Sequence, residues 1–254
     1  MKLANMVDMI RFSAQVFAAV PRTWKFSSEI FRQAGILILS SGFIICFMQL
    51  LVGGVFAVQG YYIMRQFGAG GYMSVFTALG GLRLSGPEMS GWILAAKVGC
   101  GLVAELGSAR ISEEIDALEV MGVEPKAYLV ATRLLAALIA MPFLYAIGIW
   151  LFYFGSWAMV VHVLHGVSEG GFLTVLWSFT SPLDLLFSML LSIVLGVVVI
   201  LVGCYYGFTA SGGPVGVGQN TAKSMVVNMV LVSVLGLAIE QAFWGGFGNN
   251  PIAN

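Results

Sequence analysis

The chain has 254 residues, of which 59% are hydrophobic and 9% are charged, with 12 basic and 12 acidic residues. Soluble domains carry about 25% charged residues, so this composition excludes a soluble fold and indicates an integral membrane protein. A formal net charge of zero gives no sign of nucleic-acid binding. The three cysteines lie inside apolar runs without a C-x-x-C pair, which predicts free buried thiols and neither a disulfide frame nor a metal site.

The first 33 residues predict an amphipathic helix followed by a linker. Apolar residues recur at helical spacing on one side, at Leu3, Met6, Val7, Ile10, Ala14 and Phe17. Polar residues fall on the other side, and Arg22, Lys25 and Arg32 follow closely. We expect this helix to lie in the cytoplasmic membrane interface. The alternative is a cap helix packed on the cytoplasmic loops.

Five apolar runs approach or exceed the roughly 20 residues that a membrane-spanning helix needs. They are Ala34–Val58, Met89–Leu106, Leu134–Leu164, Leu183–Phe208 and Met225–Phe243. The glycine-rich stretch Phe67–Leu84 predicts a short interfacial helix or a re-entrant segment, and Pro142 predicts a kink in the third span.

Basic residues set the expected orientation, because cytoplasmic loops carry an excess of Lys and Arg. Nine basic residues lie before span one, between spans two and three, or between spans four and five, whereas the opposite loops hold Arg65 and Arg83. The N-terminus and the loop between spans two and three are therefore expected in the cytoplasm. With five spans, residues 244–254 then form an extracytoplasmic tail.

The loop between spans two and three holds an unusual share of the charge. Ten of the 24 charged residues lie between Lys97 and Arg133, and eight of these ten follow Leu106 and so lie in the loop itself. A membrane protein that concentrates its charge in one internal loop presents that loop to something in water. The loop is the strongest candidate for a working contact.

Within this loop, residues 111–122 predict a short cytoplasmic helix of about three turns, roughly 15 Å long. Ser112 is placed to cap it, and acidic residues fall in the first turns, where the helix dipole favours anions. Gly122 is a natural stop, and Pro125 prevents resumption. The apolar stripe comprises Ile111, Ile115, Leu118 and Met121 or Gly122. An acidic face would repel anionic lipid headgroups, so a protein partner is favoured over a solvated helix without one.

Ionisable residues inside the predicted spans are candidates for a cavity or a relay. Lys97 lies about 13 Å along the helix axis from Glu88, at a depth where charge is costly and usually faces a cavity or a partner. Glu105 lies two turns further on, and Glu240 lies near the outer end of span five. A purely structural role for Lys97, by snorkelling or ion pairing, is the alternative.

Two other patterns carry weaker signals. His162, His165 and Glu169 could share one helical face as metal ligands, but histidines near a span end are far more often interfacial polar groups. The glycine-rich run 212–218 lacks the lysine of a phosphate-binding loop and follows a span. It predicts a tight turn between spans four and five. We expect no metal, no cofactor and no catalytic residue in this chain.

Two stretches of the sequence resemble a known family. The run AAKVGCGLVAELGSARISEEIDALEVMGVEPKAYLVATRLLA, Ala95–Ala136, is similar to the signature region of the MlaE/YrbE permeases, membrane subunits of ABC transporters that work with MCE proteins. The run CYYGFTASGGPVGVG, Cys204–Gly218, looks like that family's second motif. With the five-span pattern, the resemblance covers nearly the whole chain.

The resemblance implies a permease subunit and not an enzyme. The acidic helix would be the coupling helix that docks on a cytoplasmic ATPase dimer, which would bind ATP and magnesium, and the N-terminal helix would be the interfacial elbow. On the outer side, MCE proteins would pass lipid: phospholipid, fatty or mycolic acid, or sterol, with import the expected direction. The coupling residues would be Glu113, Glu114, Asp116, Leu118, Glu119, Met121 and Gly122.

The sequence departs from the family at two places. The family often has Arg where Lys97 stands, and Pro-Arg where Thr132-Arg133 stands. The Thr-Arg form resembles the B-type of the two YrbE paralogues of actinobacterial mce clusters. This implies a heterodimer with an A-type partner.

The leading hypothesis is therefore a single permease domain over residues 1–254, located in the plasma (inner) membrane. It comprises an elbow and linker (1–33), five spans with the coupling helix (34–243, with 111–122) and an outer tail (244–254). One competing hypothesis is an ion-coupled secondary transporter that uses Lys97, Glu105 and Glu240. Another is a membrane enzyme that uses His162 and His165. Neither explains the acidic helix.

Overall fold

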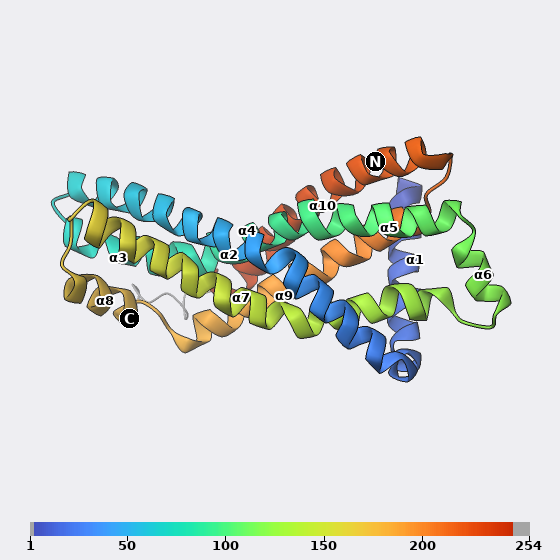
Figure 1. The fold of residues 1–254 in the computed structure, drawn as a ribbon. Helices are drawn as coiled ribbons and strands as arrows, with labels where there is room; N and C mark the ends of the chain where they lie inside the picture. Colours follow the sequence, from blue (N-terminus) through green and yellow to red (C-terminus); the bar gives the residue numbers. More distant parts are fainter. Residues whose placement is uncertain (1–2, 246–254) are drawn as a thin grey trace. The chain divides into compact units, whose positions relative to one another are not determined.

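A computed structural model describes residues 3–245, with side chains from residue 7 onward, and every regular element in that range is a helix (Figure 1). Five helical stretches are long and apolar enough to cross a membrane. They are Val7–Gln66, Gly70–Ile111, Lys126–Val163, Pro182–Phe208 and Gly213–Trp244. The predicted all-α membrane protein with five spans is confirmed. The predicted tail from residue 246 onward lies outside the described residues.

The chain begins with α1 (Leu3–Ala19), a tight 3₁₀ segment η1 (Val20–Phe26) and the long helix α2 (Ser27–Gln66). The linker is therefore η1 alone, and residues 27–33 belong to the first long helix instead of preceding it. Glu29 explains this early start, because its carboxylate accepts hydrogen bonds from Arg32 at 2.6 Å and Gln33 at 2.8 Å and so stabilises the first turns.

Helix α1 has two different apolar faces. Phe12 and Val16 are buried, and the Phe12 ring lies 5.7 Å from that of Tyr205 in α9 (Pro182–Phe208). Ile10 and Phe17, on the stripe predicted from the sequence, are exposed. That stripe is free for membrane contact, whereas the other face holds α1 to the rest of the chain.

The glycine-rich stretch is helical from Gly70 onward and continues into residues 86–111, so Phe67–Leu84 is not the separate short segment that the sequence predicted. Helix runs almost without a break through α3 (Met73–Gly80), η3 (Gly81–Ser85), α4 (Gly86–Leu94), η4 (Ala95–Gly99) and α5 (Cys100–Ile111), where η3 and η4 are π-helical. The glycines admit neighbouring aromatic rings: a Cβ on Gly81 would lie 2.7 Å from the Phe152 ring. The predicted second span is therefore part of a much longer helix.

The remaining elements are α6 (Glu114–Val120), η5 (Lys126–Ala131), α7 (Thr132–Trp157), η6 (Ala158–Val163), α8 (Glu169–Ser178), α9 and α10 (Gly213–Trp244). Helix α7 continues through Pro142. Helix α10 begins twelve residues before the predicted span at Met225. The turn between α9 and α10 needs the positive φ angles of Gly212 and Gly213, at 84° and 71°, and the later glycines of the run are helical.

The chain forms two compact units. The first comprises Met1–Ser41, Trp92–Met141 and Gly196–Val232, and the second comprises Gly42–Gly91, Pro142–Leu195 and Ser233–Asn254. Val103, Val202 and Tyr206 form a buried cluster in the first unit. The second unit buries two clusters, one around Phe152 and Tyr145 and one around Phe172 and Leu176.

Helices α2 and α7 pack closely within the second unit. A Cβ on Gly53 would lie 2.0 Å from the backbone oxygen of Phe152, and one on Gly155 would lie 2.2 Å from that of Leu50. Small residues let membrane helices approach until their backbones touch. Van der Waals packing then holds the helices together, because the hydrophobic effect does not drive helix association within lipid. These two glycines therefore fix the spacing of α2 and α7.

Candidate functional site

The acidic loop contains a helix shorter than predicted. Helix α5 ends at Ile111, and the hydroxyl of Ser112 donates to the carbonyl oxygen of Ser108 at 3.0 Å. Ser112 therefore closes α5 and does not cap the next helix, as the sequence had suggested. Glu113 adopts a left-handed φ of 60°, and α6 starts at Glu114. Its seven residues give two turns and a length of about 10 Å.

The end of α6 confirms the prediction made for Gly122. This residue has a φ of 76°, its N–H donates to the Glu119 carbonyl at 3.0 Å, and the Val123 N–H donates to the Leu118 carbonyl at 3.0 Å. The two bonds satisfy carbonyls that the helix end would otherwise leave free. Pro125 does more than stop the helix: it is the N-cap of η5 (Lys126–Ala131), at a helix start where its missing N–H costs nothing.

Few side-chain contacts hold α6 in place. Ile115 is fully buried, and Leu118 is half-buried. Asp116 accepts a hydrogen bond from Arg110 of α5 at 2.5 Å, so this predicted docking residue is engaged within the chain.

Three contacts tie the segment after α6 to the N-terminal elements. Arg22 of η1 donates to Glu124 at 2.8 Å, and Lys126 donates to Gln15 of α1 at 2.8 Å. The rings of Phe26 and Tyr128 meet edge to face at 5.2 Å. The elbow and the loop therefore form one connected surface.

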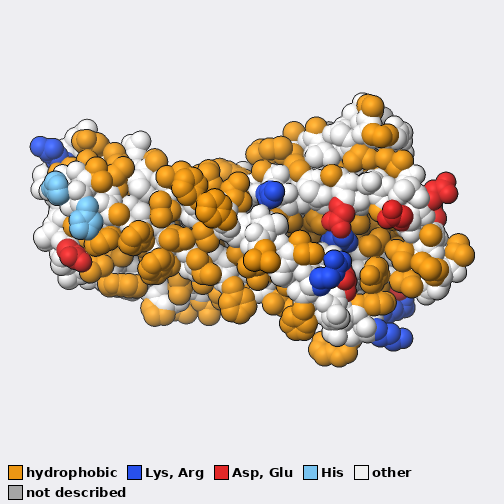
Figure 2. Space-filling model, viewed as in Figure 1, with side chains coloured by type: hydrophobic (Ala, Val, Ile, Leu, Met, Phe, Trp, Pro, Cys, Tyr) orange, Lys and Arg blue, Asp and Glu red, His pale blue; other side chains and the backbone are white. Residues whose placement is uncertain are grey.

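The outward side of α6 combines apolar and acidic side chains, and Figure 2 shows red acidic groups over α5 and α6. Val120 is 90% exposed and Met121 is 69% exposed. We call the exposed set of Glu113, Glu114, Glu119, Val120 and Met121 the α6 face. Sequence reasoning missed Val120, although an apolar residue off the buried stripe of a charged helix is a recognisable signal.

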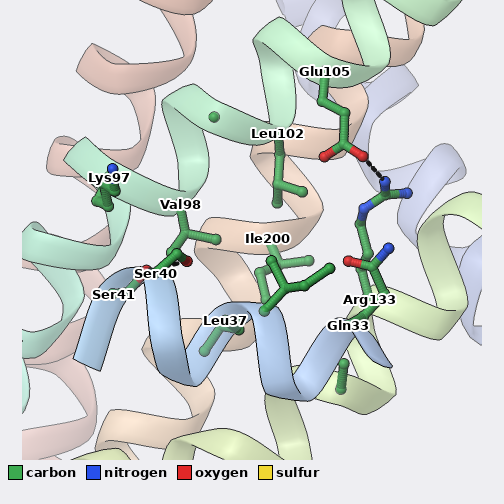
Figure 3. Close-up of a pocket in the computed structure, with 13 residues that line it drawn as sticks. Gln33, Leu37, Ser40, Ser41, Lys97, Val98, Leu102, Glu105, Arg133 and Ile200 are labelled. Atoms are coloured by element: carbon green, nitrogen blue, oxygen red, sulfur yellow. Dashed lines mark hydrogen bonds and ion pairs between the residues drawn. The ribbon is translucent and has the colours of Figure 1, made fainter. Parts of the chain in front are cut away.

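A cavity of about 240 Å³ lies in the first unit, between α2 and α5 (Figure 3). It brings together two of the predicted intramembrane residues, Lys97 and Glu105. Its polar lining also includes Gln33, Ser40, Ser41 and Arg133, and its apolar lining includes Ile36, Leu37, Val98, Leu102, Ala136 and Ile200. Lys97, which the sequence predicted to face a polar cavity or a partner group, is one of the residues that line this cavity.

Glu105 pairs with Arg133 and not with Lys97. Arg133 Nη2 lies 2.5 Å from Glu105 Oε1, and its Nη1 donates to the carbonyl oxygen of Leu129. The Arg133 side chain is 7% exposed, and its Nε has no hydrogen-bond partner in the structure. Arg133 thus holds α5 and α7 together at one side of the cavity.

Lys97 lies in the π-helical segment η4, which the sequence did not predict. Single π-helical turns inside long helices occur frequently at functional sites. Within the described range, Lys97 makes no ion pair or hydrogen bond, and its side chain is exposed. It is the uncompensated charge of the cavity.

Other predicted residues do not join this site. Glu240 belongs to the second unit, whereas Lys97 and Glu105 belong to the first. The His165 Nδ1 lies 3.1 Å from the Val161 carbonyl oxygen, and the ring of His162 meets that of Trp157 at 4.6 Å. Among residues 3–245, no group of three metal-ligating side chains is present.

The second unit holds a polar cluster that sequence reasoning missed. Arg83 Nη2 lies 3.2 Å from Asp184 Oδ1, and the Trp244 indole donates to the same oxygen at 2.5 Å. The guanidinium also lies 5.7 Å from the centre of the Trp244 ring. Sequence separation hid this cluster, because Arg83 was assigned to a loop and no pattern links it to Asp184.

Five helical stretches long and apolar enough to span a membrane, joined by an exposed amphipathic loop helix, define a multi-pass α-helical membrane protein. The family described as Permease MlaE matches residues 30–242 of the sequence. The chain therefore belongs to the MlaE permease family, a family of ABC transporter permeases whose members are not themselves the ATPase.

Relatives named as permeases match most of the chain. It is 30% identical to the "Intermembrane phospholipid transport system permease protein MlaE" of Haemophilus influenzae, over 89% of this chain and 86% of that protein. It is 28% identical to a "Probable ABC transporter permease protein" of Rickettsia felis, over 92% and 90%. It is also 26% identical to the chloroplastic protein "TRIGALACTOSYLDIACYLGLYCEROL 1" of Arabidopsis thaliana, over 86% and 60%.

Family membership decides between the hypotheses drawn from the sequence. An ABC transporter permease works with a separate ATPase. Neither the ion-coupled transporter hypothesis nor the membrane enzyme hypothesis includes such a partner.

Proposed function

We propose that this chain is the membrane-spanning permease subunit of an ATP-driven lipid transporter and that the α6 face docks on the ATPase. The observation that carries the proposal is the 90% exposure of Val120 beside the exposed carboxylates of Glu113, Glu114 and Glu119. Apolar side chains rimmed by charge are typical of protein interfaces, and Met121 suits an adaptable contact. ATP and magnesium would bind to the partner.

The mechanism would be conformational. Closure of an ATPase dimer moves α6, and because α6 is bonded to α5 through Arg110 and to the elbow through Glu124, the displacement reaches the helices around the cavity. The role of Asp116 is then to hold α6 on α5, while Leu118 and Gly122 shape the helix and its end.

The cargo and further partners follow from the relatives and the sequence motifs. The name of the Haemophilus protein supports a lipid cargo, and phospholipids, fatty or mycolic acids and sterols all fit a membrane permease. We propose import across the plasma membrane, MCE proteins on the outer side, and a second YrbE-type permease of the A-type as heterodimer partner. The single-domain organisation of residues 1–254 belongs to this proposal.

The division into units supports the proposed orientation. The N-terminus, α6 and the turn between α9 and α10 all belong to the first unit, whereas the other loops and α8 belong to the second. We place the first group in the cytoplasm. A single cysteine at Glu119 should be shielded from an impermeant thiol reagent in spheroplasts, and one at Glu169 should react. The reverse labelling would contradict this orientation.

The docking test changes two residues of α6 and, as a control, one residue of α8. Glu114→Lys on α6 should abolish co-purification of the ATPase and lipid transport, because a reversed charge opposes docking. Val120→Asp should do the same by placing a charge where apolar contact is expected. Glu169→Lys on α8 is the matched control and should leave both unchanged. Undiminished ATPase capture by Glu114→Lys and Val120→Asp would overturn the proposal.

A further inference from the structure

We propose that the cavity between α2 and α5 binds the anionic headgroup of a lipid, a phosphate or a carboxylate, with Lys97 as its cation. This inference deepens the proposed lipid transport and rests on it. It names the chemical class of cargo that the first unit recognises. It also selects among the cargoes left open above, because a sterol carries no anionic group.

The first argument for this site is the charge of the residues that line the cavity. Lys97, Arg133 and Glu105 are its charged residues. Arg133 and Glu105 neutralise each other at 2.5 Å, which leaves Lys97 as one uncompensated cation. A lone cation in a membrane span is costly and usually marks a substrate pathway or a partner group. An anion that enters the cavity supplies the missing charge.

Hydroxyl groups near Lys97 add a second step. Ser40 and Ser41 of α2 line the same cavity, and their Oγ atoms lie 3.3 Å apart. One hydroxyl must donate to the other, so the accepting hydroxyl keeps its own hydrogen free to donate elsewhere. Figure 3 shows both serines on the Lys97 side of the cavity, away from the Glu105–Arg133 pair. A cation beside a free hydroxyl suits an oxyanion.

The walls decide between a lipid and a small ion. Between Lys97 and the Glu105–Arg133 pair, the cavity is lined by Leu37, Leu102 and Ile200 (Figure 3). These side chains offer nothing to a hydrated phosphate ion but accept the aliphatic part of an amphiphile. The Glu105–Arg133 pair lies at the other end of this apolar wall, where it joins α5 to α7 (Figure 3). The occupant that matches both halves is an anionic lipid.

The test measures binding of defined lipids to the purified full-length chain in neutral detergent, by native mass spectrometry. The probes are oleate, dioleoyl phosphatidylglycerol and cholesterol, with inorganic phosphate as competitor. Lys97→Gln should weaken binding of both anionic lipids about tenfold or more, because it removes one charge-assisted hydrogen bond. Cholesterol binding should not change. Lys97→Arg should keep binding within about twofold of the parent, because the charge remains.

Lys25→Gln is the matched control, since Lys25 is an exposed cation of the same unit that does not line the cavity. Unchanged binding of oleate and phosphatidylglycerol by Lys97→Gln would overturn the headgroup site. Displacement of the lipids by equimolar inorganic phosphate would show a small-anion site instead. Failure of the proposed function is recognised separately, because Glu114→Lys should lose the ATPase and still bind both lipids.

Discussion

Two short connecting helices of this chain, α6 in the first unit and α8 in the second, are built in opposite ways. Helix α8 buries Phe172 and Leu176 completely or almost so, in a cluster with Met73 and Ala78 of α3. Helix α6 buries one side chain, Ile115, and exposes Val120 and five carboxylates of the loop around it. The exposed carboxylates and few buried side chains of α6 suit binding to a partner. The buried aromatic cluster of α8 suits a purely structural role in packing.

The same contrast extends to the units themselves. The second unit brings α2 and α7 to backbone contact at Gly53 and Gly155, while the first unit holds a cavity with an unneutralised lysine. Stability is therefore expected to depend most on the second unit and function most on the first.

The largest effect is expected from Gly53→Leu. Its side chain has no room, because even a Cβ would lie 2.0 Å from the Phe152 carbonyl oxygen, and the overlap exceeds ordinary overpacking, which costs about 1–3 kcal/mol. The folded, monodisperse fraction in detergent should be lost. Gly35→Leu on the same helix is the control, since nothing lies within 4 Å of its Cβ. Equal yields of the two variants would contradict the close packing of α2 and α7.

A smaller but substantial effect is expected from Phe172→Ala. Removing this fully buried ring leaves a cavity and should lower the free energy of unfolding by about 3–5 kcal/mol, measured by denaturant titration in micelles. Val120→Ala should change it by less than about 0.5 kcal/mol, since Val120 is exposed. Capture of the ATPase should weaken more with Val120→Ala than with Phe172→Ala. If both variants lose the same free energy of unfolding, the proposed contrast between a packed α8 and an exposed α6 is wrong.

The smallest effect is expected from Gly122→Ala. Its φ of 76° strains any residue with a Cβ, at about 1–2 kcal/mol, so the end of α6 should loosen. Capture of the ATPase should weaken several-fold without a change in membrane insertion. Gly218→Ala, at a helical glycine with open space around it, serves as control. If the Gly122→Ala variant captures the ATPase as well as the parent, this end of α6 does not contribute to ATPase binding.

Local patterns predicted the parts of the molecule that local rules govern. Hydropathy predicted the five spans, and a glycine after an apolar stripe predicted the helix end at Gly122. The same reasoning failed at Ser112 and in Phe67–Leu84, because a hydroxyl can serve either neighbouring helix and glycines can serve packing as well as turns.

Contacts distant in sequence were beyond this reasoning. Lys97 was predicted as a cavity residue from its depth, but the pairing of Glu105 with Arg133 depends on how α5 and α7 pack. The cluster of Arg83, Asp184 and Trp244 joins three separate helical segments in the same way. Charge and depth show that a residue needs a partner, and tertiary packing decides which partner it finds.

The contacts at the exit of α6 have a consequence for how force spreads. Arg22 and Glu124 are 72% and 43% exposed, and such a pair contributes about 0–1 kcal/mol. While it and the Lys126–Gln15 bond hold, a small displacement of α6 also shifts α1, which rests on α9 through Phe12. Under a larger displacement these bonds break at little cost. In the proposed mechanism, these contacts would pass small displacements of α6 on to α1 and would separate under larger ones before the membrane-spanning helices deform.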